Sequence, residues 1–138
     1  MILPYILMQK EILEIMFKVI ICGSRDFQDY EKLKERCDYY LSGKIENGEE
    51  IMIISGGARG ADSLGERYAE EKGLPCKRYP ANWDKYGKKA GYIRNLEMAE
   101  VANACIAFPC SNSENKGTEM MIRIAKEKHL LVRVVKDD

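Results

Sequence analysis

The residues best suited to bind a ligand lie in one glycine-rich segment, Ser55-Gly56-Gly57-Ala58-Arg59-Gly60-Ala61-Asp62. An apolar run ends at this segment, and a helical pattern begins directly after it. A strand, turn and helix in this order aim backbone N–H groups and the positive end of the helix at an anion. Gly56, Gly57 and Gly60 have no Cβ, so a phosphate could approach the backbone closely, and Arg59 could bond two phosphate oxygens. The segment predicts a phosphate or nucleotide cradle.

The alternative is a tight turn whose glycines only let the helix pack against the strand. The segment also matches neither of two common phosphate-binding motifs. It lacks the lysine and hydroxyl residue that end a P-loop, and Ser55 stands where the dinucleotide fingerprint Gly-x-Gly-x-x-Gly has its first glycine. The phosphate prediction therefore depends on what other parts of the chain bring to the same place.

The order of the predicted elements indicates how those parts are arranged. Short apolar runs at residues 17–22, 51–55, 76–79, 104–108 and 130–135 alternate with helical patterns. The first of these helices is expected to run from the N-cap Asp29 to about Ser42, with Gly43 ending it. Strands that are apolar throughout are typical of a parallel sheet covered on both faces. Right-handed crossovers then predict an α/β fold with a doubly wound, five-stranded parallel sheet and helices on both faces.

Three loops are expected to meet at the carboxyl edge of this sheet. They are Gly23–Phe27, Ser55–Asp62 and Pro109–Thr118, and each follows a strand, precedes a helix and carries a glycine beside a polar residue. Ligands of doubly wound sheets bind beyond the carboxyl ends of the strands. The convergence of these loops favours the cradle over the packing alternative.

The helix expected up to about Ala102 adds two polar candidates. Arg94, Met98 and Val101 share one face, and Asn95 lies beside them. This face is polar at its beginning and apolar at its end, as expected of a helix that starts under a ligand and ends in the core. The alternative is that Arg94 extends to solvent from a core-facing position.

Composition excludes several classes of function. The 138 residues contain 22 Lys plus Arg and 22 Asp plus Glu, so the formal net charge is zero. A generic nucleic-acid or membrane-surface binder would need a basic excess. The scattered cysteines form no Cys-x-x-Cys, and Cys22, Cys76 and Cys105 fall in strand-like runs. They predict reduced, small apolar core residues of a cytoplasmic protein, with no metal site and no cofactor.

The loop from Pro80 to Gly91 has unusual content. It holds Trp83, the only tryptophan, together with Tyr86 and the lysines Lys85, Lys88 and Lys89. Aromatic and basic side chains in one loop could stack and neutralise a single-stranded nucleic acid. Zero net charge disfavours that interpretation. The alternatives are that the aromatic rings close over a nucleotide base or pack at a dimer contact.

Residues 1–16 form an N-terminal extension to a domain spanning 17–138. Tyr5, Met8, Ile12 and Met16 recur at helical spacing, which predicts a short amphipathic helix packing on the domain or on a partner. Alternatively, the extension is dispensable and Met16 is a second possible start. The segment lacks the basic region and cleavage site of a signal peptide, and its apolar part is too short to span a bilayer.

The loops and the helix together resemble a known family. Four segments carry the resemblance, in the order in which the family has them: Gly23-Ser24-Arg25-Asp26-Phe27; Gly56-Gly57-Ala58-Arg59-Gly60-Ala61-Asp62; Ala81-x-Trp83-x-x-Tyr86-Gly87-x-x-Ala90-Gly91-x-x-Arg94-Asn95-x-x-Met98; and Lys116-Gly117-Thr118-x-x-Met121. They are similar to the YspA-type, cpYpsA-related branch of the SLOG superfamily over about residues 17–135. That superfamily has a Rossmann-like fold and includes the lonely-guy phosphoribohydrolases and DNA-processing protein A.

This resemblance implies binding of a nucleotide or a nucleotide-derived ligand, and it implies roles for individual residues. Gly56, Gly57 and Gly60 would hold phosphate, and Ser24 and Arg25 would lie at the base or ribose. Arg94 would match the arginine of the lonely-guy site, and Gly117-Thr118 would form a second phosphate turn. The lonely-guy enzymes carry a glutamate three residues after that threonine, where this chain has Met121.

Three functions follow from these observations. The first is a sensor or processor that binds a nucleotide-derived small molecule. The second is a hydrolase of nucleotide N-glycosidic bonds, in which Arg94 orients the substrate and Asp62 or Glu119 stabilises the developing cation. The third and least favoured is the nucleic-acid module. A homodimer contact and deep burial are the two interpretations of the apolar run Met120, Met121, Ile122 and Ile124.

Overall fold

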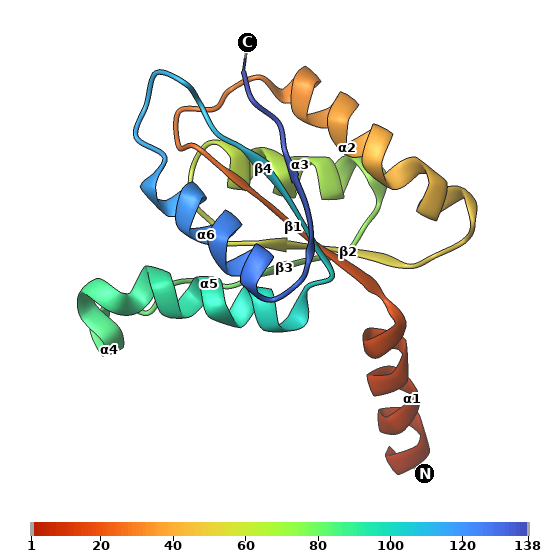
Figure 1. Cartoon of the computed structure of the whole chain (residues 1–138). Coiled ribbons are helices and arrows are strands. Elements are labelled where there is room, and N and C mark those ends of the chain that lie inside the picture. Colours follow the sequence, from red (N-terminus) through yellow and green to blue (C-terminus); the bar gives the residue numbers. More distant parts are fainter. Residues whose placement is uncertain (1, 138) are drawn as a thin grey trace.

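A computed structural model describes residues 2–137, without the side chains of residues 2, 3, 5 and 14. The elements follow one another along the chain as shown in Figure 1. The helices are α1 (Ile2–Ile15), α2 (Tyr30–Glu46), α3 (Ala61–Lys72), α4 (Trp83–Tyr86), the 3-10 turn η1 (Gly87–Lys89), α5 (Ala90–Val101) and α6 (Lys116–Glu127). The strands are β1 (Phe17–Gly23), β2 (Ile51–Ser55), β3 (Cys76–Arg78), β4 (Ala104–Phe108) and β5 (Leu131–Val134).

The strands form one parallel sheet in the order β3-β2-β1-β4-β5. Val19 of β1 is paired with Ile53 of β2 on one side and with Ala104 of β4 on the other. The chain winds outward from β1 to β3 and then returns to place β4 on the opposite side of β1. The predicted doubly wound fold is confirmed, and its switch point lies between the carboxyl ends of β1 and β4.

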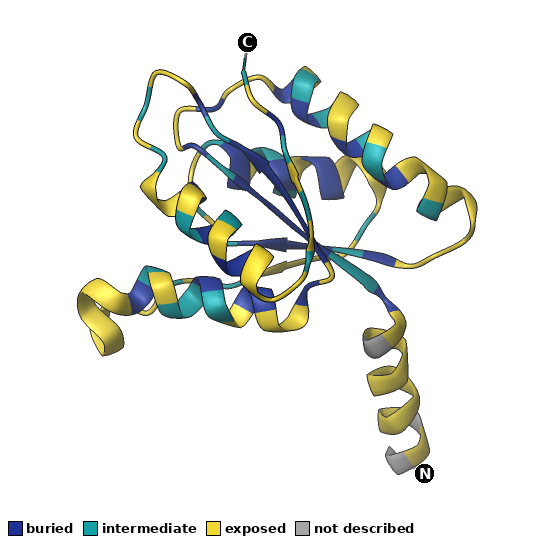
Figure 2. Cartoon of the chain, viewed as in Figure 1, coloured by how far each residue is buried: buried dark blue, intermediate teal, exposed yellow. Residues whose placement is uncertain are grey.

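Helices cover both faces of the sheet, as predicted (Figure 2). Alternate residues of β1 face opposite sides, because Val19 and Ile21 join the core under α2 and α3 while Ile20 and Cys22 join the core under α5 and α6. Met121 and Ile124 of α6 are buried in the second core, and Met120 and Ile122 pack against it. The apolar face of α6 is therefore used within the chain.

Three local predictions were wrong. Gly43 does not end α2, which continues to Glu46 and stops at Asn47 and the left-handed Gly48. Gly43 keeps ordinary helical geometry there, since a glycine ends a helix only where the chain needs positive φ. The segment expected to be a loop before Gly91 contains α4, η1 and the start of α5. Cys76 is exposed rather than buried, because β3 is a short edge strand.

The N-terminal segment is helical, and α1 projects away from the sheet (Figure 1). Its apolar side chains at Ile6, Leu7, Met8 and Leu13 are about half exposed, and Ile15 is exposed. Met16, at the junction with β1, is buried, whereas the side chain of Tyr5 lies outside the described residues. The described side chains of α1 therefore do not pack on the domain, and a role in binding a partner stays a prediction. Across residues 2–137, no helix combines the length and apolar character that crossing a bilayer requires.

Candidate functional site

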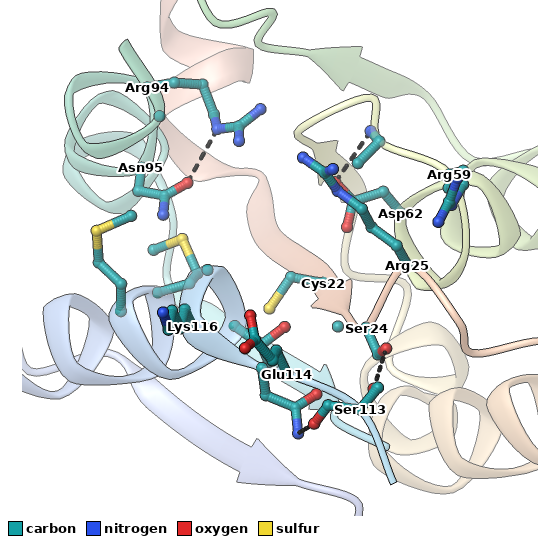
Figure 3. Close-up of a pocket in the computed structure, with 18 of the residues that line it drawn as sticks. Cys22, Ser24, Arg25, Arg59, Asp62, Arg94, Asn95, Ser113, Glu114 and Lys116 are labelled. Atoms are coloured by element: carbon teal, nitrogen blue, oxygen red, sulfur yellow. Dashed lines mark hydrogen bonds between the residues drawn. The ribbon is translucent and has the colours of Figure 1, made fainter. Parts of the chain in front are cut away.

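A cavity of about 740 Å³ opens at the switch point of the sheet. Its walls come from the loops after β1, β2 and β4, from the first turn of α3, from the segment α4 to α5, and from the first turns of α6. Figure 3 shows Cys22 near the centre, with Arg94 and Asn95 on one side, Arg25 and Asp62 on another, and Lys116 on a third. The three loops predicted to converge do meet here.

Most of the predicted site residues line this cavity. Those that do are Gly23, Ser24, Arg25, Arg59, Asp62, Arg94, Asn95, Gly117 and Thr118. Among the described residues, Gly56, Gly57, Gly60 and Glu119 are not part of its lining. Glu119 directly follows Thr118 on α6, but it is exposed and lies on a different face of the helix from the residues that line the cavity.

Three amides of the turn between β2 and α3 already have acceptors within the chain. The N–H of Gly57 donates to Ser55 Oγ (3.1 Å), the N–H of Ala58 to Asp62 Oδ2 (3.2 Å), and the N–H of Ala61 to the carbonyl of Ser24 (3.2 Å). The carboxylate of Asp62 therefore lies against the Ala58 N–H, within the turn in which the sequence predicts a phosphate. Phosphate binding at this turn stays a prediction.

Gly60 has a packing role at this turn. Its φ is +81°, and a Cβ there would lie 2.3 Å from the carbonyl oxygen of Ser24. Only glycine lets the start of α3 come this close to the loop after β1. The contact fixes the position of Arg25 relative to Asp62, so Gly60 shapes the cavity from outside it.

Asp62 is the buried acid of the cavity, with 7% of its surface exposed. Burial raises the pKa of its carboxyl group from 3.8 to about 6, although the N–H of Ala58 and the charges of Arg94 and Arg25 act in the opposite direction. Asp62 therefore changes its protonation state near pH 6. A group of this kind can accept or hold a proton during a reaction.

Arg94 reaches across the cavity to the β2–α3 turn. Its Nη1 donates to the carbonyl of Gly56 (2.7 Å), and its Nε donates to Asn95 Oδ1 (2.9 Å). A Cβ on Gly56 would lie 2.8 Å from Nη1, so the missing side chain at Gly56 makes room for the guanidinium. Arg94 does not extend away to solvent, and its charge lies within the site (Figure 3).

The N-terminus of α6 is open toward the cavity. Asn115 stands at its N-cap position, but the Asn115 side chain accepts from the Cys110 N–H (3.2 Å) and donates to the carbonyls of Cys110 (2.8 Å) and Ser113 (3.2 Å). Within residues 2–137, the N–H groups of Lys116, Gly117 and Thr118 have no hydrogen-bond acceptor. Three open amides, the helix dipole and the Lys116 ammonium together favour an anion at this point.

Two further contacts complete the rim. Ser24 Oγ and Ser113 Oγ lie 2.9 Å apart and join the loops after β1 and β4. Arg59 is exposed and pairs loosely with Asp26 at 3.9 Å. Residues outside the predicted site set also line the cavity, among them Cys22, Trp83, Lys88, Tyr92, Ser113, Glu114 and Lys116. The unusual composition of the loop before Gly91 was the signal for Trp83 and Lys88.

Across the described part of the chain, no group of His, Cys, Asp and Glu is arranged to hold a metal ion.

Comparisons with known proteins agree with this architecture. A model of the family described as "YspA, cpYpsA-related SLOG family" matches residues 17–86. The Gene 61 protein of Mycobacterium phage D29 is 33% identical over 119 residues, which cover 81% of this chain and 90% of that protein. The structure of DNA processing protein A (DprA) from Streptococcus pneumoniae superposes with a TM-score of 0.68 at 17% identity, over 93% of this chain. This chain corresponds to 53% of the DprA chain, and the likeness concerns the fold.

Proposed function

We propose that this chain, which belongs to the YspA, cpYpsA-related SLOG family, binds a nucleotide or a nucleotide-derived small molecule in the cavity between β1 and β4. It would act there as a sensor or a processor of that ligand. Family membership supports a nucleotide-related ligand, and the position of the cavity at the switch point supports this place for it.

The observation that carries the proposal is the open N-terminus of α6 in a cavity that Arg25, Arg59 and Arg94 also line. A phosphate at the helix end would accept hydrogen bonds from the backbone N–H groups of Lys116, Gly117 and Thr118 without displacing a protein group. The arginines add positive charge to the same cavity. The side chains of Arg25 and Arg59 are exposed, so they can contact an anionic ligand as it enters.

Thermal melts with nucleoside mono- and diphosphates test the proposal, because a ligand that binds only the folded state raises the Tm. At least one nucleotide should raise the Tm in proportion to its concentration. Arg25→Ala should weaken the binding of that nucleotide about tenfold, or ~1.4 kcal/mol, because it removes a charge-assisted contact to phosphate. Titration calorimetry gives both affinities.

Arg36→Ala is the matched control for Arg25→Ala. Both arginines are exposed, but Arg36 lies on α2 and is not among the residues that line the cavity. It should bind the nucleotide as the parent protein does. Equal losses in the two variants would reduce the effect to net charge, and a Tm unmoved by every nucleotide at millimolar concentration would contradict the proposal.

A second function, hydrolysis of a nucleotide N-glycosidic bond, is favoured by one observation, the buried Asp62 whose pKa lies near 6. Water would attack C1′ of the ribose while the bond to the base breaks and its electron pair leaves with the base. Asp62 would take the proton of the water, and the leaving base would be protonated from solvent. Arg94 would hold the ribose or phosphate in place.

If this reaction occurs, chromatography should detect the free base released from a nucleoside monophosphate. Asp62→Asn should lower the rate at least 100-fold, since general bases contribute roughly 10²–10⁴. Glu119→Gln is the control, because Glu119 is exposed and is not among the residues lining the cavity, and its rate should stay unchanged. An unchanged rate in Asp62→Asn would eliminate the proposed role of Asp62.

A further inference from the structure

We infer that the indole ring of Trp83 is the surface on which a flat heteroaromatic ring of the ligand stacks, at the mouth of the cavity. This inference rests on the proposed function and adds to it which part of the ligand is recognised, and by which side chain. It places an aromatic base beside α4 and α5, while the anionic part of the same ligand lies at the N-terminus of α6.

Trp83 is a large apolar side chain that is 57% exposed, yet it lines the cavity. An exposed indole forgoes the stabilisation that burial would bring. One edge of the ring lies near α5, since a Cβ built on Gly91 would lie 3.7 Å from Trp83 Cη2. The first turn of α5 thus supports the ring while more than half of its surface stays open.

The backbone around Trp83 is held firmly enough to present the ring. Asn82 caps α4, because its side chain accepts from the Lys85 N–H (3.1 Å) and its carbonyl accepts from the Tyr86 N–H (3.0 Å). Gly87, with φ of +57°, then turns the chain from α4 toward α5. The indole therefore stands on a closed turn rather than on a free loop, which favours stacking because less side-chain and backbone freedom is lost on binding.

The surroundings of the ring fit one end of a nucleotide. Lys88 and the half-exposed Tyr92 also line the cavity and belong to the same α4 to α5 segment, which offers a flat ring aromatic surface and one cation. The anion-binding groups, Lys116 and Thr118, belong to another wall of the same cavity. A ligand that is aromatic at one end and anionic at the other matches this division of the walls.

A single-stranded nucleic acid fits the observations less well. Such a strand needs a row of cations along its backbone. Of the lysines between Pro80 and Gly91, Lys88 lines the cavity, whereas Lys85 and Lys89 are not among the described lining residues. The net charge of zero points the same way.

Because Trp83 is the only tryptophan, its fluorescence reports on this site alone. The titrants are AMP, GMP, CMP and UMP, the base-free ribose 5-phosphate, and a 20-nucleotide oligothymidylate. A mononucleotide that raises the Tm should also quench the emission, whereas ribose 5-phosphate should leave the emission unchanged even where it raises the Tm. Trp83→Ala should weaken binding of that mononucleotide about tenfold, as expected for loss of one stacked base, and should leave binding of ribose 5-phosphate unchanged.

Two further variants make the test specific. Trp83→Phe should keep most of the mononucleotide affinity, because it retains a flat ring. Tyr39→Ala removes an aromatic side chain that is 71% exposed on α2, away from the cavity, and should bind like the parent protein. If Trp83→Ala also loses ribose 5-phosphate and its Tm without ligand falls below that of Tyr39→Ala, the substitution has damaged the fold. The parent protein then decides, because a mononucleotide that raises its Tm without quenching the Trp83 emission overturns the inference.

Other outcomes separate this inference from the proposed function. If mononucleotides raise the Tm but neither quench Trp83 nor bind Trp83→Ala more weakly, stacking is overturned while the proposed function stands. If the oligothymidylate alone quenches Trp83 and mononucleotides do not, the ring serves nucleic acid and the inference is wrong. If no nucleotide or ribose phosphate changes either signal, both fail together.

Discussion

Gly60→Ala should lower the free energy of unfolding by about 3 kcal/mol, because the new methyl group meets both a backbone penalty and a collision. Gly60 has φ of +81° and ψ of −129°, a region in which residues with a side chain are strained by roughly 1–3 kcal/mol. The added Cβ would lie 2.3 Å from the Ser24 carbonyl oxygen and 2.6 Å from that of Arg25, and relieving such overpacking costs roughly 1–3 kcal/mol more. Urea denaturation followed by circular dichroism measures the loss.

Gly43→Ala is the matched control for Gly60→Ala. Gly43 lies inside α2 with no atom within 4 Å of a built Cβ and without positive φ. Alanine should therefore stabilise the protein by roughly 0.5–1 kcal/mol, as in other helix interiors. If the two substitutions changed stability by the same amount and sign, the close approach of α3 to the loop after β1 would not be the cause.

The second large effect concerns the pH dependence of stability. Asp62→Asn should stabilise the protein by about 3 kcal/mol near pH 7 and by almost nothing near pH 4. The folded state raises the pKa of Asp62 from 3.8 to about 6, so it holds the proton more tightly than the unfolded chain does. Stability from this group is therefore highest below pH 4, falls as the pH rises to about 6, and stays constant above that.

Asparagine is suited to this test because its side-chain oxygen can still accept from the Ala58 N–H while the buried charge is removed. Denaturant melts of both proteins from pH 4 to pH 7.5 give the difference, in which the titration of all other groups cancels. Asp26→Asn, which removes an exposed carboxylate from the same rim, should change stability little at any pH. A difference between parent and Asp62→Asn that did not grow with pH would show that Asp62 is charged at no energetic cost.

The fold could be predicted because its strongest signals agree with one another. Ile51–Ser55 and Ala104–Phe108 are apolar runs bounded by turn residues, and both strands begin and end where the pattern does. The sequence pattern did not place the end of α2, because Gly43 lies within the helix. A glycine can end a helix or lie within it, and only the path of the following residues decides which.

The site was predicted in outline, because the position of loops follows from topology while the partner of each polar group does not. The meeting of three loops required only the order of the strands. Asp62 could have faced the cavity freely, but in the structure it bonds the Ala58 N–H. Asn115 could have capped α6, but it holds the loop after β4 instead. Competition between local and tertiary hydrogen-bond partners decides such cases, and the residue type alone does not predict which partner is bound.

The place of β1 in the sheet has a consequence for how this protein emerges from the ribosome. Lys18 in β1 donates to the side chain of Asn103, which is 85 residues further along the chain. At roughly 5–20 residues per second, roughly 4–17 s separate the synthesis of these two residues. Until then Val19 and Ile20 can pair on the β2 side only, so one apolar edge of the nascent sheet stays open to other chains. A pause in translation between β2 and β4 would lengthen that exposure and favour aggregation.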